Sequence, residues 1–284
     1  EDSLIAHGVL YDEVPLKNDD VDLEEIEKAI DETVTMVLIQ RSKGYSTRKS
    51  LTVDTIGEIC RIVKKKNPNC ICFVDNCYGE FVEDKEPLEA GADIIAGSLI
   101  KNPGGGIVEA GGYIAGKARL VERAANRLTA PGIGSEGGAM FNQHRLMFQG
   151  LFMAPSVVSE AVKGAVLAAK IFDEIGYNST PKYNEKRTDI IQNITFGSPE
   201  PLEQFCRTIQ SLSPVNGYVT PIPEYIPGYE DQVIMAGGTF IEGSTIELSA
   251  DGPMRAPYVA YMQGGINYAH VKIALTKILD KVRK

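Results

Sequence analysis

The chain has 284 residues, of which 43% are hydrophobic and 24% are charged, with 28 glycines and 15 prolines. This composition is typical of a globular protein of one or two domains and excludes disordered, collagen-like and disulfide-rich classes. The formal net charge is −9, and no dense block of Lys and Arg is present, which argues against nucleic acid or an anionic membrane as a partner. No apolar run in the sequence approaches the roughly 18 residues that a membrane span needs.

Cysteine and histidine usage narrows the class of protein further. The five cysteines show no framework spacing, which indicates reduced thiols and a cytoplasmic location. The three histidines, His7, His144 and His270, do not pair with cysteine or with one another at the spacing of metal ligands. We therefore expect no metal site.

Helices and short apolar strands alternate in the first half of the chain. Such alternation predicts a parallel sheet covered by helices on both faces, with ligands bound at the carboxyl ends of the strands. The expected elements, in chain order, are a helix over 23–30, a strand over 33–40, a helix capped by Thr52 and running to 66, a strand over 70–74, a short helix near 87–90 and a strand over 92–96.

The second half has a different pattern. Residues 155–175 form an Ala-rich helical run that suits a connection between domains. A smaller α+β domain follows, with a helix near 201–211, strands near 233–240 and a closing helix over 264–281. The predicted domains are therefore 1–154 as part of a large domain, 155–176 as a connecting helix and 177–284 as a small C-terminal domain.

Two glycine-rich segments match nucleotide-binding spacings. Residues 111–117 (GGYIAGK) have the spacing of a P-loop, but Ala118 stands where Mg²⁺ binding requires a Ser or Thr hydroxyl, and the segment includes an apparent strand. Residues 132–137 match a dinucleotide fingerprint but follow no strand. We expect neither segment to bind a nucleotide.

The strongest chemical signal is a carboxylate and a lysine at the ends of successive strands. Asp75 ends the strand CICFV, and Lys101 follows the strand ADIIA, so both should lie at one edge of the sheet. This pair suits pyridoxal phosphate (PLP): the lysine forms a Schiff base with the aldehyde, and the carboxylate keeps the pyridine nitrogen protonated. Ser98 can hydrogen-bond the phosphate, and the glycines at 104–106 let the backbone approach closely.

These residues also carry a family resemblance. VDNCYGEF (74–81) and GSLIK (97–101) resemble segments of the cystathionine and methionine lyases. The chain is more similar still to a methionine gamma-lyase-related branch, the aluminium-resistance proteins, whose segments stand here at 39–45, 74–81, 96–106, 149–155 and 246–258. The resemblance covers nearly the whole chain.

The resemblance implies a type I PLP-dependent transferase-like fold, with a mostly parallel α/β large domain and a small α+β C-terminal domain. It also implies a homodimer or homotetramer with active sites at the interface. In the family, an upstream segment supplies a phosphate-binding turn and an aromatic that stacks on the cofactor. Neither is found after Glu1, so we expect the large domain to be N-terminally incomplete in this chain.

Further residues have more than one interpretation. Arg255 resembles the small-domain arginine that clamps the substrate carboxylate, a task that suits its planar fork, but it could equally bridge the domains. Tyr78 could donate to the cofactor ring hydroxyl or simply pack in the core. Arg41 and Ser42 should face the same sheet edge, without an assigned role. Cys77 carries no sign of a catalytic thiol.

The leading hypothesis is a PLP-dependent carbon–sulfur lyase acting on a sulfur amino acid. In that reaction Lys101 removes the Cα proton, and β- or γ-elimination gives a thiol, ammonia and a 2-oxo acid. Transamination or aldol cleavage on the same fold is an alternative, since the Lys and Asp pair is common to all three. A non-catalytic scaffold is the third possibility.

Overall fold

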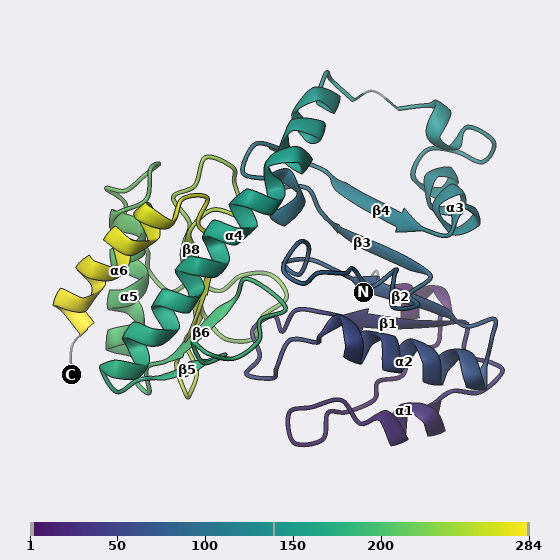
Figure 1. Ribbon diagram of the computed structural model, residues 1–284, viewed down its shortest axis with the longest axis horizontal. Helices are drawn as coiled ribbons and strands as arrows, with labels where there is room; N and C mark the ends of the chain where they lie inside the picture. The colour runs from purple at the N-terminus through teal and green to yellow at the C-terminus, as the bar shows by residue number, and fades with distance from the viewer. Residues whose placement is uncertain (1–2, 139, 283–284) are drawn as a thin grey trace.

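The computed structural model describes residues 3–138 and 140–282 and contains two sheets that are bridged by one long helix, α4 (His144–Glu174) (Figure 1). A 3-10 turn, η1 (Leu4–His7), lies near the N-terminus, and η3 (Gly134–Glu136) precedes α4. Together the sheets and helices form a mixed α/β fold.

The first sheet has four strands in the order β1–β2–β3–β4. Strands β1, β2 and β3 run parallel, and β4 is antiparallel to β3, so the parallel-rich sheet expected from the alternation is confirmed. The bounds of the strands are β1 Met36–Gln40, β2 Ile71–Asp75, β3 Ile94–Ser98 and β4 Gly112–Gly116.

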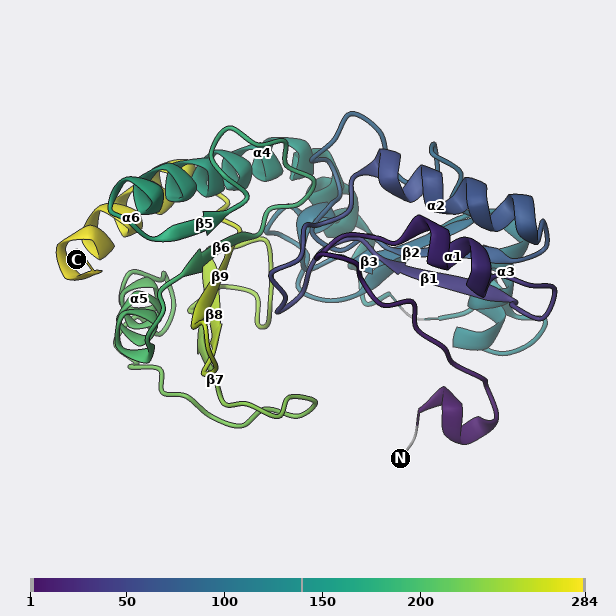
Figure 2. The ribbon, with the colours of Figure 1, turned by 90° about the horizontal axis from the view of Figure 1, so that it is seen from below.

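Helices α1 (Leu23–Ala29) and α2 (Val53–Lys66) cover one face of this sheet (Figure 2). Thr52 caps α2 as predicted, because its hydroxyl accepts the N–H of Thr55 at 3.0 Å. On the opposite face, the side chains of Met36 and Leu38 in β1 are 48% and 62% exposed. The prediction that helices cover both faces is therefore wrong for β1 within the described residues.

Several boundaries differ from the expected ones. Strand β3 begins at Ile94 rather than at residue 92. Just before it, the N–H of Cys72 in β2 donates to the Asp93 side chain at 2.7 Å instead of to a backbone carbonyl. The segment near 87–90 forms successive turns rather than a helix. Helix α3 (Ala118–Leu128), which follows β4, was not predicted.

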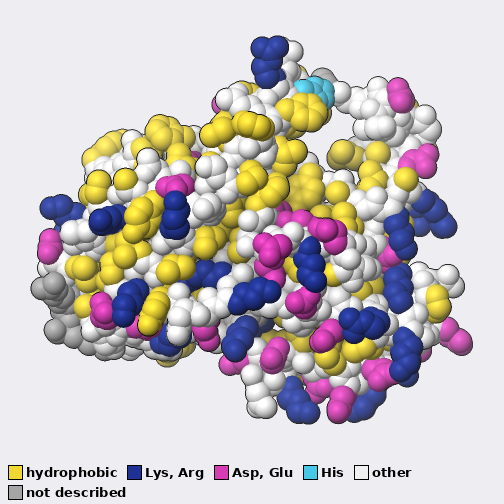
Figure 3. Space-filling view, in the orientation of Figure 1, with side chains coloured by type: hydrophobic (Ala, Val, Ile, Leu, Met, Phe, Trp, Pro, Cys, Tyr) yellow, Lys and Arg dark blue, Asp and Glu magenta, His cyan; other side chains and the backbone are white. Residues whose placement is uncertain are grey.

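Helix α4 begins at His144, well before the predicted start at residue 155, and carries Pro155 inside it. By length and composition it could cross a membrane, which the sequence did not suggest, but its buried residues pack against the 3-10 turn η2 (Asn102–Gly104) and the second sheet. One side of the helix is therefore part of the protein core. Its first turns expose Phe148 and Phe152, and apolar side chains gather along the helix in Figure 3.

The second sheet is antiparallel, in the order β5–β6–β9–β8–β7. Helices α4, α5 (Pro199–Ser211) and α6 (Tyr268–Val282) pack on one of its faces around Phe172 and Phe205, each fully buried. The opposite face is turned toward the first sheet. The bounds of the strands are β5 Asn178–Thr180, β6 Gln192–Thr195, β7 Val233–Ala236, β8 Ser249–Pro253 and β9 Val259–Gln263.

Candidate active site

The candidate site is built on the carboxyl ends of β2 and β3. Asp75 is the last residue of β2 and pairs in register with Ala96 of β3. Because side chains alternate along a strand, Asp75, Ala96 and Ser98 share the sheet face that is turned away from α2. The Asp75 carboxylate and the Ser98 hydroxyl therefore project from the same face, near the carboxyl ends of β2 and β3.

Lys101 follows β3 and lies over an aromatic ring. Its Nζ is 4.4 Å from the centre of the Tyr78 ring. Tyr78 has φ +69°, and contacts at both ends hold it there: its carbonyl accepts the N–H of Ile190 at 3.3 Å, and its hydroxyl donates to the Ser244 carbonyl at 3.4 Å. The Lys101 amine thus lies over the face of the Tyr78 ring, while the Tyr78 hydroxyl points toward the second sheet.

The turn after β2 links Asp75 to Lys101 through Cys77. One oxygen of Asp75 accepts the N–H of Cys77 at 3.1 Å. Burial raises the pKa of the Cys77 thiol to about 11; the Lys101 ammonium opposes this shift, and the carboxylates of Asp75 and Glu80 add to it. Burial therefore outweighs the Lys101 ammonium, and the sulfur stays a thiol at neutral pH, not a nucleophilic thiolate.

Arg41 stabilises the turn that follows β2. Its side chain is fully buried and forms ion pairs with Glu83 at 3.2 Å and Glu86 at 3.3 Å. It also donates to the Asn76 side chain at 2.7 Å, and its backbone N–H donates to the Asp75 carbonyl at 3.0 Å. The arginine that the sequence left without a role is a positioning residue for the backbone that carries Asp75.

Glu80 connects the loop that follows β2 with the loop that follows β3. Its carboxyl accepts the Tyr113 hydroxyl at 2.8 Å, and its carbonyl accepts the side-chain N–H of Asn102, the residue after Lys101, at 3.0 Å. Burial raises the pKa of Glu80 to about 8. Glu80 was not predicted from the sequence; Asn76 and Asn102, which directly follow the two predicted site residues, were the available signal.

Ser42 joins the two halves of the molecule. Its hydroxyl donates to Asp189 at 2.7 Å, and Ser50 donates to the same carboxylate oxygen. Lys43 is buried beside them, and desolvation lowers its pKa, although Asp189 opposes that shift. These contacts fix the loop after β1 against the segment that precedes β6.

Ser98 and the following glycines have local contacts of their own. The Ser98 hydroxyl accepts the N–H of Ile100 at 3.3 Å, which leaves its hydrogen available to a ligand. A Cβ at Gly105 would lie 2.6 Å from the Gly150 carbonyl of α4, and one at Gly104 would collide with the Leu99 carbonyl. These two glycines therefore let the loop pack on α4 and on itself, a different use from the close ligand approach that we predicted.

Arg255 follows β8 and contacts the loop that follows β1. Its guanidinium is 3.0 Å from Asp231 and donates to the Tyr45 carbonyl at 3.1 Å. It lines a cavity of about 380 Å³ whose wall includes Tyr45 and Tyr261. Its assignment as a clamp for the substrate carboxylate stays a prediction.

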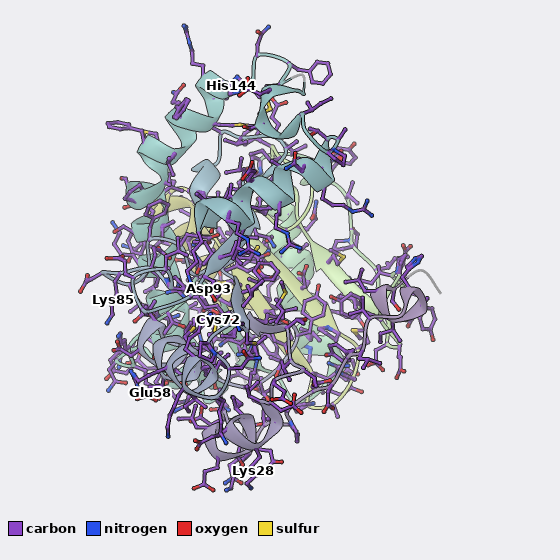
Figure 4. All side chains as sticks on the ribbon, turned by 90° about the vertical axis from the view of Figure 1, so that its right-hand side faces the viewer. Lys28, Glu58, Cys72, Lys85, Asp93 and His144 are labelled. Carbon is purple, nitrogen blue, oxygen red and sulfur yellow. The ribbon has the colours of Figure 1, made fainter. Side chains whose placement is uncertain are left out.

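The P-loop-like segment has a structural explanation. Residues Gly112–Gly116 form β4, and the Lys117 amine that follows is 2.5 Å from the buried carboxylate of Asp93. Lys64 is 2.6 Å from the same carboxylate, which lies beside Cys72 in Figure 4. Lys117 thus pairs with this carboxylate at the start of β3, and the segment forms a strand, not a phosphate-binding loop.

A parallel-rich sheet that brings a lysine and an aspartate to adjacent strand ends defines the chain as an α/β protein with a candidate active site at that edge. Comparison with known proteins identifies its family. The family model for methionine gamma-lyase matches residues 1–283, and the chain belongs to that family.

The relatives extend the match over almost the whole chain. Protein YnbB of Bacillus subtilis is 52% identical over 281 residues, which are 99% of this chain and 67% of that protein. A 33.9 kDa protein from the glnA 5' region of Lactobacillus delbrueckii is 51% identical over 280 residues, 98% of this chain and 92% of that one.

Solved structures agree with the fold. One from Listeria monocytogenes has a TM-score of 0.96 at 51% identity and covers 99% of this chain and 70% of its own. A carbon-sulfur lyase involved in aluminum resistance from Clostridium novyi has a TM-score of 0.93 at 49% identity, with 99% and 66% covered. The metB protein of Corynebacterium glutamicum, at 17% identity, has a TM-score of 0.58, with 90% and 66% covered, and shows a shared fold alone.

Proposed function

We propose that the protein is a PLP-dependent carbon–sulfur lyase of the type I fold, acting on a sulfur amino acid. The observation that carries the proposal is the placement of Lys101 and Asp75 at the ends of neighbouring parallel strands, with the Asp75 pair to Ala96 fixing their register. The family and the name of the Clostridium novyi relative support the reaction class.

The residues present fit the cofactor. The Lys101 amine lies over an aromatic face, and no ion pair to it is formed within the described part of the chain. Asp75 is half-buried, on the same sheet face as Ser98, whose hydroxyl hydrogen is available. Lys101 would hold the aldehyde carbon, Asp75 the pyridine nitrogen and Ser98 the phosphate.

The chemistry divides between the cofactor and the chain. When bound, the cofactor supplies an electron sink for the charge that develops at the substrate Cα. Lys101 acts as the base that takes the Cα proton, and the Tyr78 ring beneath the amine limits where that amine can move. Asp75 carries the charge that keeps the pyridine nitrogen protonated, and Arg41 and Glu80 hold the two loops in place.

Self-association in the cytoplasm as a homodimer or homotetramer, with sites at the interface, is part of the same proposal. The apolar side chains of Phe148 and Phe152 are 71% and 82% exposed at the start of α4, beside the loop that follows Lys101. Exposed aromatic surface of this kind is typical of a protein interface.

The assignment of Lys101 is tested by borohydride reduction of the PLP-loaded protein followed by peptide mapping. We expect the pyridoxyl group on Lys101, and loss of elimination in Lys101→Ala with activity retained in Lys65→Ala, whose amine is an exposed partner of Glu27. A modified lysine elsewhere would overturn the assignment.

The reaction class is tested by product analysis with cysteine, cystathionine, methionine and threonine. A thiol together with ammonia and a 2-oxo acid supports the lyase. Exchange of amino and keto groups alone would make the protein an aminotransferase, and aldehyde release from threonine alone would make it an aldolase. No visible cofactor absorbance under any condition would favour a scaffold.

A further inference from the structure

The face of the second sheet that is turned toward the candidate site carries a buried carboxyl group, Asp251 of β8. Its neighbours Ala250 and Gly252 point to the opposite face, where Ala250 belongs to the helical core and Gly252 packs against Leu202. Asp251 is 6% exposed, and the Tyr45 hydroxyl is hydrogen-bonded to it. Among the described residues, no lysine or arginine contributes to its electrostatic environment.

Burial without a cation has a measurable consequence for this group. Desolvation raises the pKa of Asp251 to about 6, and the Tyr45 hydroxyl opposes that shift only in part. A buried carboxylate is normally paired with a positive charge or with several hydrogen-bond donors, because its desolvation is costly. Among the described residues, Asp251 therefore has a hydroxyl donor but no cation beside it.

A second polar group on this face, the Ser249 hydroxyl, has no hydrogen-bond partner among the described residues. Ser249 lies two residues earlier on the same strand, so its side chain projects from the same face. Its hydroxyl oxygen is buried and has no hydrogen-bond partner within the described part of the chain, and the residue is 3% exposed. Buried hydroxyls are nearly always bonded, so this one indicates a ligand or a water.

Both groups open into a cavity of about 210 Å³, whose wall also includes Ser244 and Met235. At about 30 Å³ for each water, this space corresponds to roughly seven waters, enough for the end of an amino-acid side chain. The Tyr78 hydroxyl donates to the Ser244 carbonyl, and the other part of the same tyrosine lies under the Lys101 amine. One residue thus connects the cavity to the candidate active site.

We infer that this cavity is a subsite for a cationic group, the ammonium at the far end of a substrate side chain, with Asp251 as its ion-pair partner and Ser249 as a hydrogen-bond acceptor. The inference depends on the proposed function, because the Cα of the substrate must lie at Lys101 for its far end to reach this cavity. It selects thioether amino acids with a second, distal ammonium over those that end in an alkyl group.

The test compares two substrate-like probes of equal length, S-(2-aminoethyl)-L-cysteine, which ends in an ammonium, and S-propyl-L-cysteine, which ends in a methyl group. Binding is measured by calorimetry in the Lys101→Ala background, where elimination cannot consume the probe. A hydrogen bond to a charged group strengthens binding more than contact with a methyl group does, so we expect at least tenfold tighter binding of the aminoethyl probe.

In Asp251→Asn the preference should fall to within twofold, while binding of the propyl probe stays unchanged and reports a folded protein. If Asp251→Asn does not fold, Ser249→Ala should still weaken the aminoethyl probe by about threefold and leave the propyl probe unaffected. Equal affinity for both probes in the parent would mean that the cavity holds only water and would overturn the subsite.

These outcomes separate the subsite from the lyase. A protein that prefers the aminoethyl probe but eliminates no sulfur amino acid keeps the subsite and refutes the proposed reaction. A protein that eliminates thiol from both probes with equal kcat/KM, and binds them equally, keeps the reaction and refutes the subsite.

Discussion

The amine of Lys101 lies 4.4 Å from the centre of the Tyr78 ring, and the hydroxyl of that tyrosine reaches the carbonyl of Ser244 in the other half of the molecule. The ring of Tyr78 therefore lines the candidate active site, and its hydroxyl connects that site to the segment that precedes β8. Its φ of +69° is unusual for a bulky residue, and strain of this kind is often kept at functional sites.

The two contacts of Tyr78 can be separated by mutation. Tyr78→Phe keeps the ring under the amine and loses the bond to Ser244, so we expect kcat within about threefold of the parent. Tyr78→Ala removes the ring, and with it an attraction of about 0.5–2 kcal/mol, so kcat/KM should fall about tenfold. Steady-state elimination assays measure both. Equal losses in the two variants would show that the hydroxyl, and not the ring, is what matters.

Asp75→Asn tests whether the charge at the end of β2 is needed. The amide has the same shape and can still accept the N–H of Cys77, so the turn should fold as before. It cannot stabilise a protonated pyridine nitrogen, and loss of a hydrogen bond between charged groups predicts a fall in kcat of roughly 10- to 100-fold. Retained visible absorbance of the bound cofactor is the control, and an unchanged kcat would refute the role of Asp75.

The candidate site was predictable where its residues follow a local pattern. The apolar run CICFV ends in Asp75, and β2 ends at the same residue. By contrast, β8 (SADGP) has no apolar alternation. It is buried because β7 and β9 pair with its two edges, α5 packs on one face of the sheet and the other face is turned toward the first sheet. The orientation of Tyr78 likewise depends on Ser244, which is 166 residues away in the sequence. Contacts of this range leave no periodic signal, so Asp251 and its cavity were not foreseen.

Arg41 should be among the most sensitive positions of the part of the chain that forms the first sheet. Arg41→Met fills a similar volume but removes the guanidinium from Glu83, Glu86 and Asn76. Of the two carboxylates, the more buried is that of Glu83, whose side chain is 4% exposed. Removing one partner of a buried ion pair costs about 3–5 kcal/mol in the free energy of unfolding. Urea denaturation measures the loss.

Lys85→Met is the matched control for Arg41→Met, because it breaks the exposed pair with Asp54, where the side chains are 48% and 66% exposed. Such surface pairs contribute about 0–1 kcal/mol. If Arg41→Met were no more destabilising than Lys85→Met, the buried network would not hold the turn after β2.

Glu80 gives the protein a pH dependence of stability with a definite sign. Burial raises its folded-state pKa from 4.5 to about 8. Between these values the folded chain keeps a proton that the unfolded chain has lost, so stability is fully present below about pH 4.5 and is lost as pH rises through about 8. A shift of this size corresponds to a few kcal/mol.

Glu80→Gln removes this titration, because the amide is neutral at every pH and its oxygen can still accept the Tyr113 hydroxyl. Urea unfolding at pH 5, 6.5 and 8.5 should therefore give nearly equal stability for the two proteins at pH 5 and a more stable variant at pH 8.5. Comparing the two proteins at each pH cancels the other groups that titrate in this range, such as Asp251. Parallel stability curves would mean that Glu80 is ionised in the folded protein and that Arg41 compensates its charge.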